Sequence, residues 1–246
     1  ACNAVIHKIG QIEEEADVCY REFLLDTSDA ELKQMALDAQ GAALEANMGV
    51  SPKAHYMMGE ILRRSGDDGG ANQIGMAPGA RWIGCRNMDV GVGTPTTYIE
   101  CFEWFIAPTD LAGQNPDPAM APDTINNSWG CPPSEGCNPG NFAVMQQVVE
   151  NVRAAGIFVA VSAGNSGSSC STVEDPAAIY DASFTVGSTT STDAPSSFSS
   201  RGPVTVDGSN RMKPDIAAPG SNIRSSVPGG GYEGGWSGTS MAGPHV

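Results

Sequence analysis

The apolar residues in the first quarter of the chain recur at helical intervals. Between Ser28 and Gly49 they form one stripe, with Ser28 and Glu31 at the spacing of a capping box and Gly49 as a stop signal. The stripe consists of Leu32, Met35, Ala36, Ala39, Ala43 and Ala46. The pattern predicts a helix between Ser28 and Gly49, and weaker patterns indicate a short strand at 23–25 and a second helix near 54–64.

After residue 66 short apolar runs alternate with loops rich in glycine and proline. We expect a strand over 80–86, a helix over 98–106 that ends at Pro108, a surface loop over 109–123 and a strand over 124–128. A further helix has Phe142, Met145, Val148, Val149 and Val152 on its inner face, and Gly156 ends it before a strand over 157–162. The alternation predicts an α/β fold with a mostly parallel sheet, helices on both faces and a right-handed crossover.

Composition divides the chain at the same place. Residues 1–66 hold five of the 30 glycines and one of the 17 prolines. We therefore expect two parts: a helical segment of unclear origin over 1–66 and an α/β domain over 67–246. The length is sufficient for one such domain with an appended segment.

The balance of charge excludes some classes of partner. The formal net charge is −15, from 13 basic and 28 acidic residues. This charge disfavours sequence-independent binding to nucleic acid or to an anionic membrane. The sequence has no run of about 18 apolar residues, and its N-terminus lacks the apolar core of a signal peptide. An acidic surface fits a secreted protein, so we expect an extracellular or cell-surface protein with neither nucleic acid nor membrane as a partner.

Two segments that follow predicted strands point to one cleft. In a parallel sheet, ligands bind beyond the carboxyl ends of the strands. Ser128–Gly130 follows one strand, and Gly164 and Asn165 follow the next strand along the chain. We therefore expect these two segments to lie side by side at one edge of the sheet.

The segment SGTSMAGPHV, residues 237–246, places a serine among small residues where a helix should begin. Pro244 fits only a first helical turn, so it fixes the start of that helix near Ser240. Free backbone N–H groups and the helix dipole there favour the negative charge that acyl transfer develops on nearby oxygens. Ser240 is thus a candidate nucleophile, although the three letters GTS alone are more typical of a Gly/Ser loop before a helix.

Other segments extend this motif into a family pattern. The run GTSMAGPH resembles the nucleophile segment of the subtilisin-like serine proteases, or subtilases. Five more segments resemble landmarks of that family in the same order: GMAPGARWIGCRNMD at 75–89, NNSWG at 126–130, AVSAGNSG at 160–167, SFSSRGP at 197–203 and KPDIAAPG at 213–220. The wording is most similar to the bacillopeptidase F type. The resemblance implies a three-layer subtilisin-like fold and a partial peptidase domain over 67–246, which ends about one turn into the helix that follows Ser240.

The resemblance also assigns roles to residues of the predicted cleft. Asn165 resembles the family's oxyanion donor, with the backbone N–H of Ser240 as the second donor. Ser128–Gly130 resembles the strand that binds an extended peptide through its backbone, with Trp129 in a subsite wall or, alternatively, as a buried tryptophan at a strand end. Ala163 and Gly164 resemble the lining of the first specificity pocket, and their small size suggests room for a large apolar side chain.

The histidine and aspartate of a serine-protease triad are not recognisable. The family's Asp-Thr-Gly and His-Gly-Thr-His segments are absent, and alignment through the Met58-Gly59 pair puts Lys53 and Tyr56 at the histidine positions. His55 and Asp26 are weak candidates for a shifted version of the two motifs. A serine is a weak nucleophile without such a base.

The remaining histidines offer no better base. His7 has no supporting pattern, and His245 shares the helix of Ser240 without a triad role.

Two functions therefore remain open. One is a serine endopeptidase in which Ser240 attacks the peptide and Asn165 stabilises the oxyanion. The other is a catalytically silent domain that binds extended peptides. A histidine within hydrogen-bond reach of the Ser240 hydroxyl would separate them. A different serine hydrolase is disfavoured, because the segment lacks the second glycine of a nucleophile elbow.

Cysteines and acidic residues define no metal site. The seven cysteines are Cys2, Cys19, Cys85, Cys101, Cys131, Cys137 and Cys170. Their spacing does not suggest zinc, and Cys131 and Cys137 could either close a disulfide ring or remain as free thiols. Asp67, Asp68, Asp175 and Asp181 could offer oxygens to calcium, but their spacing defines no site. We therefore expect no cofactor.

Overall fold

The computed structural model describes residues 74–77, 80–81, 83–110, 113–227 and 231–246. The elements expected at 23–25, 28–49 and 54–64 lie outside these ranges. By its contacts the chain forms two compact units. One is Ala1–Val92 with Arg224–Gly234, and the other is Gly93–Ile223 with Gly235–Val246.

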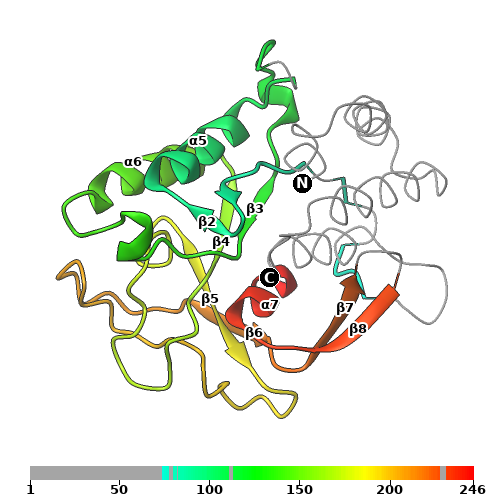
Figure 1. Ribbon diagram of the computed structural model, residues 1–246, viewed down its shortest axis with the longest axis vertical. Coiled ribbons are helices and arrows are strands. Elements are labelled where there is room, and N and C mark those ends of the chain that lie inside the picture. The colour runs from blue at the N-terminus through cyan, green and yellow to red at the C-terminus, as the bar shows by residue number, and fades with distance from the viewer. Residues whose placement is uncertain (1–73, 78–79, 82, 111–112, 228–230) are drawn as a thin grey trace. The chain divides into compact units, whose positions relative to one another are not determined.

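The second unit is built on a parallel sheet (Figure 1). Its strands are β3 (Thr124–Asn127), β4 (Phe158–Ser162), β5 (Phe184–Thr189) and β6 (Ile216–Pro219), in the order β3-β4-β5-β6. All three pairings are parallel. The predicted strands at 124–128 and 157–162 are confirmed as β3 and β4, and the α/β fold class is confirmed with them.

Helix α6 (Phe142–Ala154) connects β3 to β4 and follows the predicted apolar face. All five expected inner residues are buried. Gly156, at φ 89°, ends the helix in the left-handed conformation that glycine adopts without strain. The apolar periodicity alone was sufficient for this element.

Helix α5 (Pro95–Ile106) begins three residues before the predicted start. The side chain of Thr94 accepts a hydrogen bond from the backbone of Thr97, whose hydroxyl accepts one from the backbone of Thr94. Pro95 occupies the first turn, where its missing N–H has no consequence. This threonine capping box extends the helix ahead of its apolar face.

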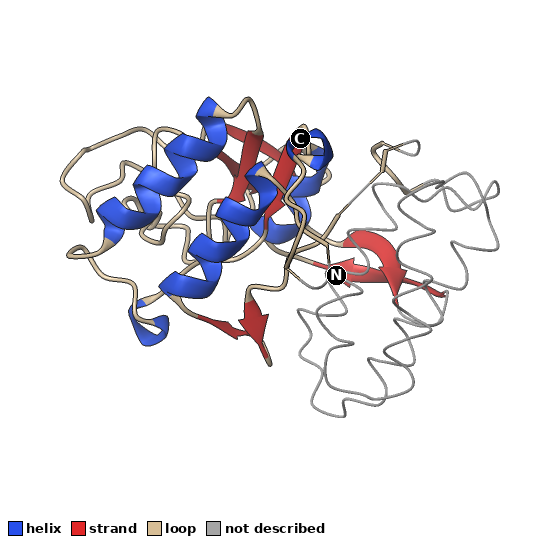
Figure 2. Ribbon diagram, turned by 90° about the horizontal axis from the view of Figure 1, so that it is seen from above, coloured by secondary structure: helices blue, strands red, loops and turns tan. Residues whose placement is uncertain are grey.

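The connection after α5 matches the predicted surface loop. Its described residues contain one short 3-10 turn, η1 (Pro118–Met120), before β3. Helices α5 and α6 pack together on one side of the sheet (Figures 1 and 2). Helix α7 (Thr239–Ala242) lies on the other side, where Ala242 packs with Val186 and Ala218. The predicted layers on both faces are therefore present.

The strand predicted over 80–86 is wrong. The described residues of that range have no regular structure, and the nearest strand is β1 (Met88–Asp89), which pairs with β2 (Val92–Gly93). The apolar run is short, and Gly84 follows it directly, which lowers β-propensity.

A third, two-stranded sheet joins β7 (Ile223–Val227) to β8 (Gly231–Trp236). No helix in the described ranges has both the length and the apolar character that a membrane span requires.

A glycine in the loop after β4 is required by close packing. The N–H of Gly167 donates to Phe198 O at 2.8 Å, and a Cβ at this position would lie 2.0 Å from the carbonyl oxygen of Ser199. Gly167→Ala is therefore expected to lower the free energy of unfolding by about 1–3 kcal/mol, because backbone atoms must shift. Urea denaturation measures this change. Gly234→Ala is the control, because its Cβ would enter open space; equal stability of the two variants would contradict the packing argument.

Candidate active site

Three segments meet at the carboxyl edge of the parallel sheet. Ser128–Gly130 follows β3, and Ala163–Asn165 follows the neighbouring β4, whose Val161 is paired with Asn127. Helix α7 contacts β4, β5 and β6 and brings Ser240 to the same edge. The two segments that sequence placed together are therefore adjacent, as predicted.

Ser240 lies in the first turn of α7, where the start of the helix was predicted, but Pro244 lies beyond that first turn. Gly238 precedes the helix in extended conformation, and its carbonyl oxygen accepts the N–H of Met241 at 3.0 Å. After four residues the helix continues as a 3-10 turn, η3 (Gly243–His245), which accommodates Pro244. The start of the helix thus fixes the backbone position of Ser240.

Ser240 and Ser128 hold one another through two hydrogen bonds. The hydroxyl of Ser240 donates to Ser128 O at 3.4 Å, and the hydroxyl of Ser128 donates to Ser240 O at 3.2 Å. The side-chain amide of Asn126 donates to the Ser128 hydroxyl at 3.0 Å. The candidate nucleophile therefore lies directly beside the candidate peptide-binding segment.

The side chain of Asn165 is fixed by the residue before the candidate nucleophile. Its Oδ1 accepts the backbone N–H of Thr239 at 2.8 Å and the Thr239 hydroxyl at 3.1 Å. The hydroxyl of Thr239 accepts the N–H of Gly164 at 3.2 Å. With its oxygen so occupied, Asn165 keeps its Nδ2 amide group without a partner among the described residues, and the residue is exposed. The side chain of Asn165, with its two N–H donors, is thus held against Thr239, the residue that directly precedes Ser240.

Thr239 is the site residue that the sequence prediction missed. It is fully buried, and it joins Asn165 and Gly164 to the helix of Ser240. Its position directly before the candidate serine was the signal that could have indicated this role.

The other expected substrate-binding residues are close to this point. Ala163 is buried, and its N–H donates to Val186 O at 3.0 Å. Gly164 adopts φ 102°. A Cβ on Gly130 would lie 2.9 Å from Asp175 Oδ2, so only glycine allows this carboxylate to pack against the backbone. Burial raises the pKa of Asp175, and the neighbouring charges of Glu174 and Glu135 raise it further.

Trp129 packs against helix α5. Its ring stacks on Tyr98 with centroids 3.9 Å apart and planes 10° apart, and it lies tilted to Phe102 at 5.8 Å. The indole is half-buried, so it packs on the helix like a buried tryptophan at a strand end and keeps some exposed surface, as a subsite wall requires. Tyr98 and Phe102, four residues apart on one helix face, could have been predicted as a pair but not as partners of Trp129.

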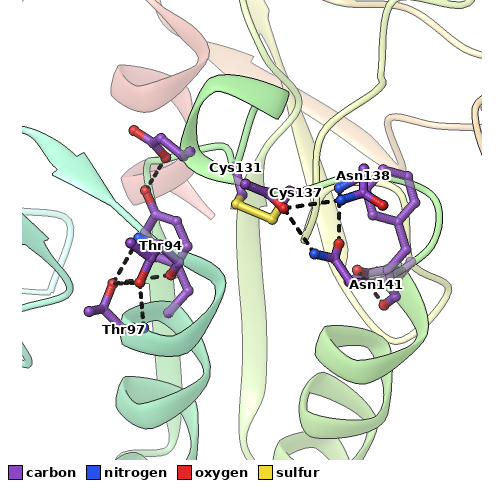
Figure 3. The surroundings of a disulfide bond; sticks show 11 residues. Thr94, Thr97, Cys131, Cys137, Asn138 and Asn141 are labelled. Carbon is purple, nitrogen blue, oxygen red and sulfur yellow. Dashed lines mark hydrogen bonds between the residues drawn. A yellow bond between two sulfur atoms is a disulfide. The ribbon is translucent and has the colours of Figure 1, made fainter.

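A disulfide joins Cys131 to Cys137, directly after the candidate peptide-binding segment (Figure 3). The expectation of a small ring is confirmed, and the alternative of two free thiols is excluded. The loop continues to α6 through Asn138 and Asn141, which are linked to one another and to Gly136 O by hydrogen bonds (Figure 3).

No histidine of the described ranges contacts the Ser240 hydroxyl. The Nδ1 of His245 is hydrogen-bonded to the carbonyl oxygen of Met241 at 2.8 Å. His7, His55, Asp26, Lys53 and Tyr56 lie outside the described residues.

Acidic residues do not gather around a metal position in the described part of the chain. No group of three or more His, Cys, Asp or Glu side chains could hold an ion there. Asp175 packs on Gly130, whereas Asp181 lies 3.9 Å from Arg153. Asp67 and Asp68 are not among the described residues.

Comparison with known proteins gives consistent similarities. The model of the "Subtilase family" matches residues 57–246. Bacillopeptidase F of Bacillus subtilis (strain 168) is 45% identical over 181 residues, which cover 72% of this chain and 12% of that protein. Subtilisin E of the same organism is 35% identical over 176 residues, or 70% of this chain and 38% of the relative.

A solved structure shows the same likeness. The crystal structure of a cold adapted subtilisin-like serine proteinase superposes with a TM-score of 0.55 at 29% identity, over 80% of this chain and 58% of the other. The chain thus spans less than two thirds of the length of each of these relatives.

Proposed function

This chain belongs to the subtilase family, and from that premise we propose that it is a serine endopeptidase with Ser240 as its nucleophile. One observation carries the proposal. The Ser240 hydroxyl lies within hydrogen-bond distance of Ser128 O, while Thr239 fixes Asn165 so that its Nδ2 group is left to donate. The residues proposed as nucleophile, oxyanion donor and peptide-binding backbone therefore lie together at one edge of the sheet, which supports the proposal.

In the proposed reaction the Ser240 hydroxyl oxygen attacks the scissile carbonyl carbon and its proton passes to a base. Asn165 Nδ2 and the backbone N–H of Ser240 donate to the oxyanion of the tetrahedral intermediate. The carbon–nitrogen bond then breaks, and the amine leaves with the proton that the base returns. Water hydrolyses the acyl-enzyme by the same steps and restores the serine. This chemistry needs no cofactor.

The base is proposed to be a histidine outside the described residues. His55 is the candidate in this sequence, with Asp26 to orient it. A base of this kind is required, because a serine hydroxyl without an adjacent proton acceptor is a weak nucleophile.

The substrates are proposed to be extended polypeptides. Ser128–Gly130 would pair with the peptide backbone as an added strand, so that alternate side chains face subsites. Trp129 would form a subsite wall, and Ala163 and Gly164 would border the first specificity pocket. An extracellular or cell-surface site of action agrees with the Cys131–Cys137 disulfide, because such bonds persist in oxidising compartments.

Incubation with β-casein, followed by mass spectrometry of the products, tests this proposal. We expect peptides with new internal termini, and we expect none after pretreatment with phenylmethylsulfonyl fluoride, which blocks activated serines. Intact casein after prolonged incubation with the folded chain would contradict the endopeptidase and favour a silent peptide-binding domain.

A further inference from the structure

Trp129, in the middle of the candidate peptide-binding segment Ser128–Gly130, packs against helix α5. Trp129 stacks on Tyr98 and touches Phe102, and both partners are buried on α5. An indole packed in this way cannot change rotamer without displacing the helix face. The stacking of Trp129 on Tyr98 therefore restrains the position of the Ser128–Gly130 backbone.

Tyr98 is itself fixed at both ends. Its ring is completely buried, and a Cβ on Gly93 would overlap the ring, so that only glycine permits this packing. Its hydroxyl donates to Glu135 Oε2 at 2.5 Å. Burial, and after it the hydrogen bond to Glu135, raises the pKa of Tyr98 well above its ordinary value. The phenol therefore keeps its proton at neutral pH and can donate to Glu135.

Glu135 belongs to the ring that Cys131 and Cys137 close. Both sulfurs are buried, and the N–H of Cys131 donates to Pro176 O at 3.2 Å. Glu135 ends a single 3-10 turn, η2 (Pro133–Glu135), inside the ring. The ring begins at the residue after Gly130, so its geometry and that of the peptide-binding segment are covalently linked.

We propose that Tyr98 is a positioning residue, which together with Glu135 and the Cys131–Cys137 ring holds the Ser128–Gly130 backbone ready for an extended peptide. This inference rests on the proposed function. Its physical basis is preorganisation: a segment that is already ordered loses less conformational entropy when the peptide binds. The Tyr98–Glu135 hydrogen bond connects residues 37 positions apart and thus joins α5 to the ring.

The test compares one substrate that can pair with the Ser128–Gly130 backbone and one that is too short to do so. Tyr98→Phe and Glu135→Gln each weaken the connection and keep the side-chain volume. With a tetrapeptide p-nitroanilide ending in phenylalanine, we expect KM to rise about 3–10-fold while kcat changes less than about twofold. With a single-residue phenylalanine p-nitroanilide, which lacks the upstream residues, KM is expected to stay within about twofold. The double variant should equal the stronger single variant, because the two residues share one hydrogen bond.

Tyr180→Phe is the matched control. Tyr180 is also buried, and its hydroxyl donates at 2.8 Å to the carbonyl oxygen of Phe142, the first residue of α6. This variant should lose stability without changing either KM. A Tyr98→Phe variant that behaves like Tyr180→Phe would overturn the positioning role.

Amide hydrogen exchange makes the test independent of catalysis. We expect the amides of residues 128–130 to exchange faster in Tyr98→Phe and Glu135→Gln than in Tyr180→Phe. If the chain hydrolyses no peptide but amide exchange at residues 128–130 accelerates as expected, the proposed function fails while the positioning role of Tyr98 is retained. Unchanged amide exchange in Tyr98→Phe and Glu135→Gln would overturn the positioning role, whatever the hydrolytic activity.

Discussion

Replacing Ser240 with alanine is expected to lower kcat for peptide hydrolysis by about 10⁶-fold, the loss that removal of the nucleophile causes in subtilisin. Alanine removes the only oxygen at this position that could form the acyl-enzyme. The helix should form unchanged, because within the described residues the Ser240 hydroxyl donates only one long hydrogen bond, to Ser128 O. Initial rates with a tetrapeptide p-nitroanilide, at equal concentrations of folded protein, measure the effect.

Ser191→Ala serves as the control for this experiment. Ser191 is exposed in the turn after β5, where its replacement should leave kcat and KM unchanged. Retention of more than about one per cent of the activity in Ser240→Ala would place the nucleophile at another residue, since that loss is far too small for a missing nucleophile.

Asn165→Ala is expected to lower kcat by about 10²–10³-fold with little change in KM. This is the usual effect of removing one oxyanion-hole donor, and it was measured in a subtilisin. The interaction strengthens as negative charge develops on the carbonyl oxygen, so its loss acts on the transition state more than on the bound substrate. Steady-state kinetics of Asn165→Ala and of the unaltered protein, with circular dichroism to confirm folding, separates the effect on kcat from the effect on KM.

Asn165→Asp distinguishes catalysis from a structural role at the same position. Aspartate can still accept the N–H and the hydroxyl of Thr239, as Asn165 Oδ1 does at 2.8 and 3.1 Å. It has no Nδ2 donors, and it adds negative charge where the oxyanion would form. We therefore expect kcat at least as low as in Asn165→Ala, but with more of the stability retained. Full activity in Asn165→Asp would exclude the donor role.

The elements that sequence predicted well are those with a strong local pattern. Helix α6 has apolar residues at helical spacing and a terminal glycine, and strand β4 is a short apolar run between clear breaks. The start of α5 was missed because Thr94 and Thr97 form a capping box from two threonines, without an acidic residue. The expected strand over 80–86 failed because a brief apolar run gives no period to distinguish it from a loop.

The candidate site divides in the same way. Ser240, Asn165 and Ser128–Gly130 lie in short segments that are readable one at a time, and the parallel sheet brings them to one edge. The stacking of Tyr98 on Trp129 and its hydrogen bond to Glu135 join distant parts of the chain. Contacts of this kind depend on tertiary packing, so no local pattern indicated them.

Reaction with a fluorophosphonate probe tests the central claim, an activated Ser240, most directly. The probe forms a covalent phosphonate only with a serine whose hydroxyl is deprotonated by a nearby base, so it reports nucleophile and base together. Intact-mass analysis followed by peptide mapping locates the adduct. We predict one adduct per folded chain, on the peptide that contains Ser240, and none in Ser240→Ala. A folded chain that takes up no probe, or takes it up on another serine, would contradict the claim.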